Sequence, residues 1–255
     1  MTPILAFDIE TIPDTAGLAK LYGLPADTPA DQVAEIAFQR RRMNTGSDFL
    51  QHHVHRVVVI SCVLRSDEGL RVWSLSGEDE AANVQRFFEG IEKYTPQLVS
   101  WNGGGFDLPV LHYRAMVHGI SAPRYWDMGE DDRDFKWNNY LSRYHTRHLD
   151  LMDLLALYQP RANVGLDDLA KLVGFPGKLG MDGAAVWPAY QRGETAAISD
   201  YCETDAVNTY LLYLRFQLLR GQFTPERYQQ EIEVVRTHLA TLNLPHWQAF
   251  LAAWA

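Results

Sequence analysis

Apolar residues gather in short runs that predict strands separated by helices. Runs rich in strand formers occupy residues 4–11, 57–64, 70–75 and 97–101. The second run is apolar at almost every position, which is typical of a strand buried on both faces. Asp67-Glu68-Gly69 reads as a turn between the second and third runs, so the first three strands are expected to form an antiparallel meander.

Helical periodicity accounts for much of the remaining chain. Residues 78–94 form the clearest amphipathic pattern, with Val84, Phe87, Phe88 and Ile91 on the apolar side. Residues 148–158 are interpreted as a strand leading into a helix, or as helix throughout. Further helices are expected at 108–118, 166–173, 184–191 and 198–219, and after Thr224.

Residues 14–55 form an excursion between the first two strands. Two helices are expected there, over 14–22 and 31–42. The arginines at 40–42 are either a solvated helix end or a rim that contacts phosphates. His52, His53 and His55 follow, but no cysteine or carboxylate completes a metal-binding pattern around them.

Composition and charge narrow the class of protein. A length of 255 residues with 47% hydrophobic and 22% charged residues suits one large domain or two small ones. The net charge of −9 argues against wrapping duplex DNA, although bound cations and a local basic patch still permit a nuclease. Cys62 and Cys202 are expected to be reduced, packed thiols. With no signal peptide or run long enough to span a bilayer, a cytoplasmic location without membrane contact is expected.

Two carboxylates interrupt the first apolar run. Alternate strand positions project to one face, so Asp8 and Glu10 point together while Phe7 and Ile9 pack on the other side. Paired carboxylates in an apolar strand repel each other and resist desolvation. Either a hard divalent cation holds them there, or the strand end merely reaches solvent.

Further acids stand at a glycine-rich loop and on the long late helix. Asp107 follows Trp101-Asn102-Gly103-Gly104-Gly105-Phe106 at a helix start, where an N-cap is the simplest role. Tyr201 and Asp205 are four residues apart and therefore share a helix face. Asp200 and Glu203 point elsewhere and are expected to be solvated.

A meeting of Asp8, Glu10, Asp107 and Asp205 would require cations. Two hard cations about 3.5–4 Å apart are the known solution for in-line displacement at phosphorus. One would lower the pKa of the attacking water, and the other would stabilise the leaving oxygen. The phenol of Tyr201 could orient that water.

At this point the sequence resembles the DEDD 3′→5′ exonucleases. Their three motifs appear in order as Phe7-Asp8-Ile9-Glu10-Thr11, Asn102-x-x-x-Phe106-Asp107 and Tyr201-x-x-x-Asp205. The tyrosine four residues before the last aspartate marks the DEDDy branch, since the histidine branch would have His at position 200. His148 to Leu151, Gly165 to Ala170 and Lys178 to Trp187 extend the likeness to stand-alone exonucleases related to the proofreading domain of family B DNA polymerases.

The resemblance implies an α/β, RNase H-like fold, with a mixed five-stranded sheet flanked by helices. It implies a single exonuclease domain over residues 1–255, with an insertion at about 14–55 and a helical extension at about 221–255. Two Mg²⁺ or Mn²⁺ ions would be held by Asp8, Glu10 and Asp205, with Asp107 acting on the second through water. Tyr201 and Glu10 would orient the water. The substrate would be single-stranded nucleic acid with a free 3′ end, DNA being favoured and RNA possible, and the products nucleoside monophosphates.

Substrate contacts are expected from two places. Asn102 and Phe106 belong to the second motif. Basic residues among aromatics in the stretch 119–147 suit a single strand, although the same loop could simply be packed down by its own rings. The basic candidates are Arg133, Lys136, Arg143 and Arg147. An RNase H-like endonuclease and a non-catalytic nucleic-acid adaptor remain the alternative functions.

Overall fold

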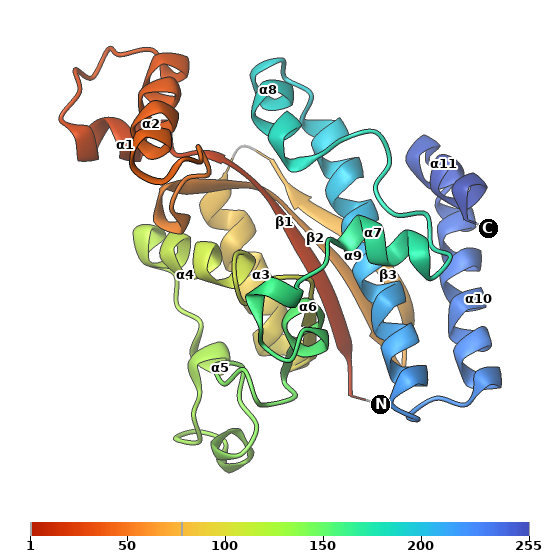
Figure 1. Ribbon diagram of the computed structural model, residues 1–255. Coiled ribbons are helices and arrows are strands. Elements are labelled where there is room, and N and C mark those ends of the chain that lie inside the picture. Colours follow the sequence, from red (N-terminus) through yellow and green to blue (C-terminus); the bar gives the residue numbers. More distant parts are fainter. Residues whose placement is uncertain (1, 78, 255) are drawn as a thin grey trace.

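A mixed sheet forms the centre of the molecule (Figure 1). The computed structural model describes residues 2–77 and 79–254. The sheet has five strands in the order β3-β2-β1-β4-β5, which confirms the predicted sheet. β1 pairs antiparallel with β2 and β2 with β3, as the meander required, whereas β4 lies parallel to β1 and β5 parallel to β4. The strands are β1 (Ile4–Pro13), β2 (His55–Ser66), β3 (Gly69–Ser76), β4 (Gln97–Ser100) and β5 (His148–Asp150).

Helices occupy most of the predicted places. The helix expected from Glu78 begins at Glu80 in the described part of the chain, and Glu78 itself lies outside the described residues. Across residues 2–77 and 79–254, no helix is both long and apolar enough to cross a membrane. The α-helices are α1 (Thr15–Tyr22), α2 (Ala30–Thr45), α3 (Glu80–Tyr94), α4 (Asp107–His118), α5 (Pro123–Trp126), α6 (Leu151–Leu155), α7 (Leu166–Leu172), α8 (Val186–Gln191), α9 (Thr195–Leu219), α10 (Pro225–Leu242) and α11 (Pro245–Ala253). Short 3₁₀ turns are η1 (His52–Val54), η2 (Arg133–Lys136), η3 (Pro160–Ala162) and η4 (Gly183–Ala185).

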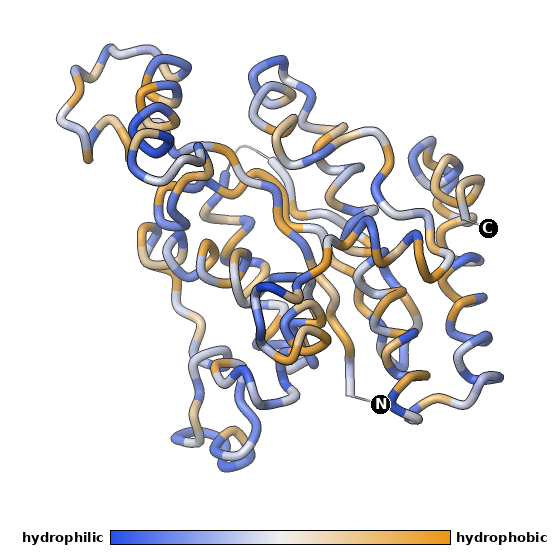
Figure 2. The backbone as a smooth tube through the Cα atoms, in the orientation of Figure 1, coloured by the Kyte–Doolittle hydropathy of each residue, from blue (hydrophilic) through white to orange (hydrophobic). Residues whose placement is uncertain are grey.

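The two faces of the sheet are covered by different helices. Phe7 and Ile9 of β1 pack with α3 and α4, whereas Ala6 packs with α9 on the opposite face. Hydrophobic residues follow the central strands in Figure 2, in keeping with burial on both faces. Residues 57–64 of β2 are all buried, as their unbroken apolar character predicted. The alternation along β1 therefore decides which side chains reach α9.

The segment 14–55 forms a small unit with its own apolar cluster. Leu18, Val33, Ala37, Leu50 and Val54 make up its buried residues. Figure 1 shows α1 and α2 beyond the C-terminal end of β1, on the side of α4. This unit is thus placed where β1 delivers Asp8 and Glu10.

The C-terminal helices fold back along α9. His246 of α11 lies between two acids of α9, with Nδ1 3.2 Å from Asp200 Oδ1 and Nε2 3.0 Å from Glu203 Oε2. Ser74 also donates to Glu203, at 2.8 Å. The prediction that both acids are solvated is wrong for Glu203, because β3 and α11 close over it. The side chain of Asp200 stays 50% exposed.

A buried ionic network joins α4 to the start of α1 and α3. Arg114 contacts Glu80 at 2.6 Å and Asp14 at 2.7 Å, and its side chain is 4% exposed. Glu80 also accepts from the backbone N–H of Val57 at 2.6 Å and lies 2.8 Å from His118 Nε2. Glu80 compensates most of a buried guanidinium, and its removal would leave Arg114 with Asp14 as its remaining acidic partner.

Replacement of Glu80 by alanine is expected to lower the free energy of unfolding by about 3–5 kcal/mol, the cost of breaking a buried ion pair by removing one partner. Urea denaturation measures this loss. The exposed pair of Arg42 and Asp48, 2.8 Å apart, provides the control. Asp48→Ala should cost no more than about 1 kcal/mol. Equal losses in the two variants would contradict a structural role for the network.

Candidate active site

β1 carries two acids onto the sheet face that α9 covers. Asp8 and Glu10 lie on the α9 side, opposite Phe7 and Ile9, as the strand alternation predicted. Glu10 is 8% exposed. The thiol of Cys202 on α9 approaches Asp8 closely, with Sγ 3.4 Å from its carbonyl oxygen and 3.5 Å from Oδ2. Glu10 is therefore buried and Asp8 half-buried beside α9, so the pair does not lie at a solvated strand end.

A tight loop after β4 delivers Asp107. Asp150 holds this loop by accepting from the N–H groups of Asn102 (3.0 Å) and Gly104 (2.8 Å). A Cβ at Gly103 would lie 2.4 Å from the side chain of Ser100, so this tight turn requires glycine there.

The carboxylate of Asp107 points to β1. It is the first residue of α4, is 4% exposed, and accepts from the N–H of Ile9 at 3.1 Å. The N-cap interpretation is wrong, because Phe106 holds the cap position.

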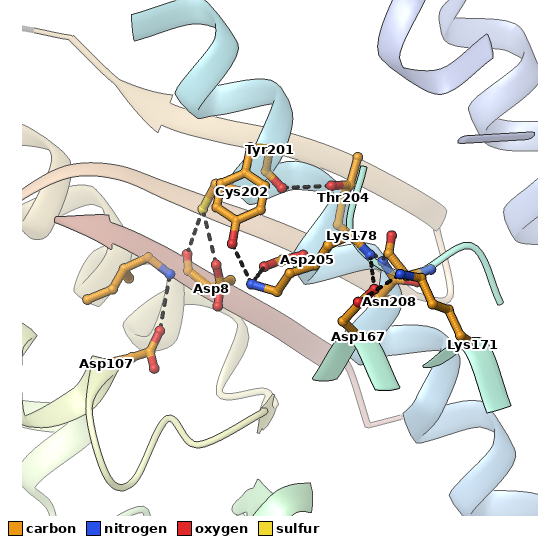
Figure 3. Close-up of polar contacts among 12 residues, drawn as sticks. Asp8, Asp107, Asp167, Lys171, Lys178, Tyr201, Cys202, Thr204, Asp205 and Asn208 are labelled. Atoms are coloured by element: carbon orange, nitrogen blue, oxygen red, sulfur yellow. Dashed lines mark hydrogen bonds and ion pairs between the residues drawn. The ribbon is translucent and has the colours of Figure 1, made fainter. Parts of the chain in front are cut away.

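α9 contributes Tyr201 and Asp205 from one face of the helix (Figure 3). Asp205 is 3% exposed, and its Oδ2 lies 2.6 Å from Nζ of Lys178. The same ammonium donates to the hydroxyl of Tyr201. The other carboxylate oxygen, Oδ1 of Asp205, has no hydrogen-bond partner among the described residues.

Burial and mutual repulsion disfavour the charged forms of these acids. The pKa of Asp8 is raised well above its ordinary value by burial and by Asp107 and Glu10. Burial and Asp205 raise the pKa of Glu10 in the same way. The pKa of Asp107 rises to about 7, chiefly through burial. Repulsion in such a cluster is relieved only when the carboxylates are protonated or when cations neutralise their charge.

The donor set suits a hard divalent cation. Carboxylate oxygens are the preferred ligands of Mg²⁺ and Mn²⁺. Asp8 and Glu10 offer oxygens within 4.8 Å of one another, and the unpartnered Oδ1 of Asp205 is a further buried acceptor. Cys202 lies in the same group, but burial together with Asp8 and Glu10 raises the pKa of its thiol, which keeps it a neutral donor.

Lys178 is the site residue that the local sequence pattern did not single out. It lies in a Gly/Pro-rich loop before α8, where no periodicity marks an inward side chain. Although burial disfavours the ammonium, Asp205, Asp8 and Glu10 raise the pKa of Lys178 above its ordinary value. The lysine thus supplies a positive charge among the acids. Cys202 was likewise expected only as a packed thiol.

The expected substrate contacts lie in two regions. Asn102 and Phe106 are in the loop that delivers Asp107. In the stretch 119–147, Arg143 pairs with Asp153 at 2.7 Å, and Arg147 donates to the carbonyl of Asn138 at 2.7 Å. Arg133 and Lys136 are exposed on η2.

The loop 119–147 is packed down in part by its own rings, which was one of its two interpretations. Tyr125, Phe135 and Tyr140 are buried and pack the loop down, whereas Trp137 and Tyr144 are 76% and 75% exposed. A cavity of about 800 Å³ runs between this loop, the Asn102–Gly105 turn and α6. Contact with nucleic acid by the basic residues stays a prediction. Arg147 is the most constrained of these residues for contact with a phosphate, because its guanidinium also lies 3.9 Å from the ring centroid of Phe135.

A comparison with known families decides the relationship of the chain. The model of a family described as predicted 3′–5′ exonucleases related to the exonuclease domain of PolB matches residues 47–254. The chain belongs to this family. The matched range includes Asp107, Tyr201 and Asp205 and begins after Asp8 and Glu10.

Curated relatives and a solved structure agree with this assignment. The catalytic polypeptide of DNA polymerase epsilon from Kluyveromyces lactis is 30% identical over 223 residues, which are 84% of this chain and 9% of that protein. Its counterpart from Candida glabrata is 30% identical over 224 residues, with the same coverage. The chain thus spans about a tenth of these polymerases. The family B DNA polymerase of Pyrobaculum calidifontis superposes with a TM-score of 0.50 at 16% identity, over 86% of this chain and 25% of that one. The fold is RNase H-like, as predicted.

The raised pKa of Asp107 makes the stability of the metal-free protein depend on pH. The folded state keeps a proton that the unfolded chain releases above the ordinary pKa of 3.8, so the free energy of unfolding falls as the pH rises toward about 7. Asp107→Asn retains an acceptor for the N–H of Ile9 but does not titrate. In EDTA, the variant should therefore gain in melting temperature relative to wild type above pH 7.

Below pH 4, the difference between Asp107→Asn and wild type should become constant, because both side chains are then neutral. Asp27→Asn is the control, since Asp27 is exposed in the loop between α1 and α2. A pH profile of Asp107→Asn parallel to that of wild type would show that Asp107 is ionised in the fold.

Proposed function

We propose that this protein is a metal-dependent 3′→5′ exonuclease that releases nucleoside monophosphates from single-stranded nucleic acid, with DNA favoured and RNA possible. The observation that carries the proposal is the convergence of Asp8, Glu10, Asp107 and Asp205 from β1, α4 and α9. Membership of the PolB-related exonuclease family supports the same activity. An adaptor would have no use for four clustered acids that repel one another.

Two divalent cations, Mg²⁺ or Mn²⁺, complete the proposed site. Asp8, Glu10 and Asp205 would bind them directly, and Asp107 would act on the second ion through water. When bound, the ions would supply an acidified water and charge stabilisation at the leaving oxygen. The carboxylates of this chain would then stay ionised, because the cations offset the repulsion that raises their pKa values.

Tyr201 and Lys178 are the two polar residues that assist the four carboxylates. The pKa of Tyr201 is raised above its ordinary value by burial and by Asp205, so the phenol keeps its proton and is a hydrogen-bond donor and not a base. Its role is to position the attacking water together with Glu10. Lys178 neutralises Asp205 in the metal-free protein, and its flexible stem lets the ammonium move toward a substrate phosphate when cations arrive.

Digestion of labelled oligonucleotides tests the proposal. Single-stranded DNA and RNA carrying a 3′ or a 5′ label are incubated with Mg²⁺, Mn²⁺ or EDTA. An exonuclease of this polarity releases the 3′ label first as a mononucleotide and shortens the 5′-labelled strand stepwise. Cleavage of circular single strands would instead indicate the endonuclease. Binding without turnover would indicate the adaptor. Asp205→Ala should abolish hydrolysis, whereas Asp168→Ala, an exposed acid on α7, should not.

Tyr201→Phe removes one hydroxyl and keeps the packing of the ring. We expect kcat to fall roughly 10²-fold, the scale of losing one well-placed polar group in a catalytic site, while KM stays within a few-fold. Single-turnover kinetics with saturating Mg²⁺ measure this effect. An unchanged kcat would remove the phenol from the mechanism.

The exposed basic residues of the loop 119–147 are expected to contact phosphates. The triple variant Arg133→Gln, Lys136→Gln, Arg143→Gln should weaken binding of any single-stranded sequence and flatten its salt dependence by about 0.7 per lost contact. Fluorescence anisotropy at several salt concentrations gives the slope. Arg71→Gln on β3, at the opposite edge of the sheet, is the control. If both proteins keep the wild-type slope, the strand follows another path.

A further inference from the structure

The ammonium that reaches the acid cluster comes from a loop. Lys178 lies between α7 and η4, with its Nζ 2.6 Å from Oδ2 of Asp205 and 4.8 Å from the ring centroid of Tyr201. A lysine side chain is a point charge on a flexible four-carbon stem. The position of this ammonium therefore depends on where the backbone of the loop is held.

α9 holds the residue that precedes Lys178 through the side chain of Asn208 (Figure 3). Oδ1 of Asn208 accepts from the N–H of Gly177 at 3.2 Å, and Nδ2 donates to the carbonyl of the same glycine at 2.9 Å. Nδ2 also donates to the carbonyl of Thr204 at 2.9 Å. Asn208 is fully buried and lies three residues after Asp205. The helix that carries Asp205 thus also fixes the loop that brings the ammonium to it.

α7 holds the next backbone group through Asp167. Oδ1 of Asp167 accepts from the N–H of Lys178 at 2.7 Å, and Oδ2 lies 2.7 Å from Nζ of Lys171. Gly165, and not Asp167, holds the N-cap position of α7. A Cβ at Gly177, where φ is +71°, would lie 2.4 Å from Oδ1 of Asp167, so the contact requires glycine. Two consecutive residues of the loop are therefore held by two different helices.

We propose that Asn208 and Asp167 are positioning residues, which hold the backbone at Gly177 and Lys178 so that the ammonium reaches Tyr201 and Asp205. For its kinetic consequence, this inference rests on the proposed exonuclease function. Supporting hydrogen bonds keep a functional group within about 0.5 Å of its productive position, and a misplacement of about 1 Å can cost roughly 10²-fold in rate. The amide and the carboxylate thus act on hydrolysis through the ammonium that they place.

Substitutions at Asp167 separate the hydrogen bond to the loop from the ion pair. Asp167→Ala removes the acceptor for the N–H of Lys178, whereas Asp167→Asn keeps that acceptor and loses the ion pair with Lys171. We expect Asp167→Ala to lower kcat by up to roughly 10²-fold and Asp167→Asn to stay within a few-fold of wild type. Asp168→Ala, at the exposed neighbouring position on α7, is the control that should change nothing. The melting temperature of each variant shows that folded protein is compared.

A double-variant cycle shows whether Asp167 acts through Lys178. Lys178→Met removes the ammonium, so Asp167→Ala should have no further effect on kcat in that background. A purely structural role would lower kcat by the same factor with and without the ammonium, and that result would overturn the proposal. Asn208→Ala, which removes both bonds to Gly177, should follow the same pattern as Asp167→Ala. Because Asn208 is fully buried, the Asp167 variants decide the outcome if Asn208→Ala does not fold.

The position of the ammonium can be observed without hydrolysis. The sequence has five lysines, so protein labelled with ¹⁵N-lysine gives few ammonium signals in an NMR correlation spectrum. Hydrogen bonds slow the exchange of ammonium protons and make such a signal visible, and the signal of Lys178 is the one that Lys178→Met removes. In EDTA, this signal should persist in Asp167→Asn and shift or disappear in Asp167→Ala.

A Lys178 signal that is the same in Asp167→Ala and in wild type would exclude the positioning role. A protein that shows the expected change in the spectrum but never hydrolyses an oligonucleotide would refute the proposed function and leave the positioning role standing.

Discussion

Repulsion among buried carboxylates is the constraint on which the structure depends. Asp8 and Glu10 are held inside the molecule with Asp107 and Asp205 nearby, and burial and proximity raise the pKa of each of them. Removal of such groups from water is expensive unless opposite charge compensates it. In the metal-free protein, the ammonium of Lys178 provides part of this compensation. The arrangement therefore suits divalent cations, and it lowers the stability of the metal-free protein.

The scaffold around the acids resists that repulsion through independent supports. β1 lies in the middle of the sheet: Ile4–Ala6 pair with both β2 and β4, and Asp8 and Glu10 stay paired with β2. The loop before α4 is held by backbone donors to Asp150 and by the bond from Ile9 to Asp107. α9 is anchored by a long buried face against the sheet. Rigid elements hold a charged site more accurately than loops do.

Two further segments border the site from different sides. The segment 14–55 packs its rings against Phe106, beside Asp107. The C-terminal α11 places His246 against Glu203, two residues after Tyr201 on α9. Neither segment contributes an acid to the cluster, yet each contacts an element that does.

The sequence by itself determined the strands, the main helices and the four acids. The alternation along Ile4 to Thr11 and the helical spacing of Tyr201 and Asp205 are local properties of the sequence. Both are present in the folded structure as predicted. Tertiary structure decided what depends on distant partners. The carboxylate of Asp107 is oriented by the N–H of Ile9 on β1. Lys178 reaches the acids from a loop that has no periodicity. Glu203 is covered by a helix more than forty residues later in the chain. Contacts of this kind leave no local pattern, because each is fixed by packing between segments and not by the propensity of either one.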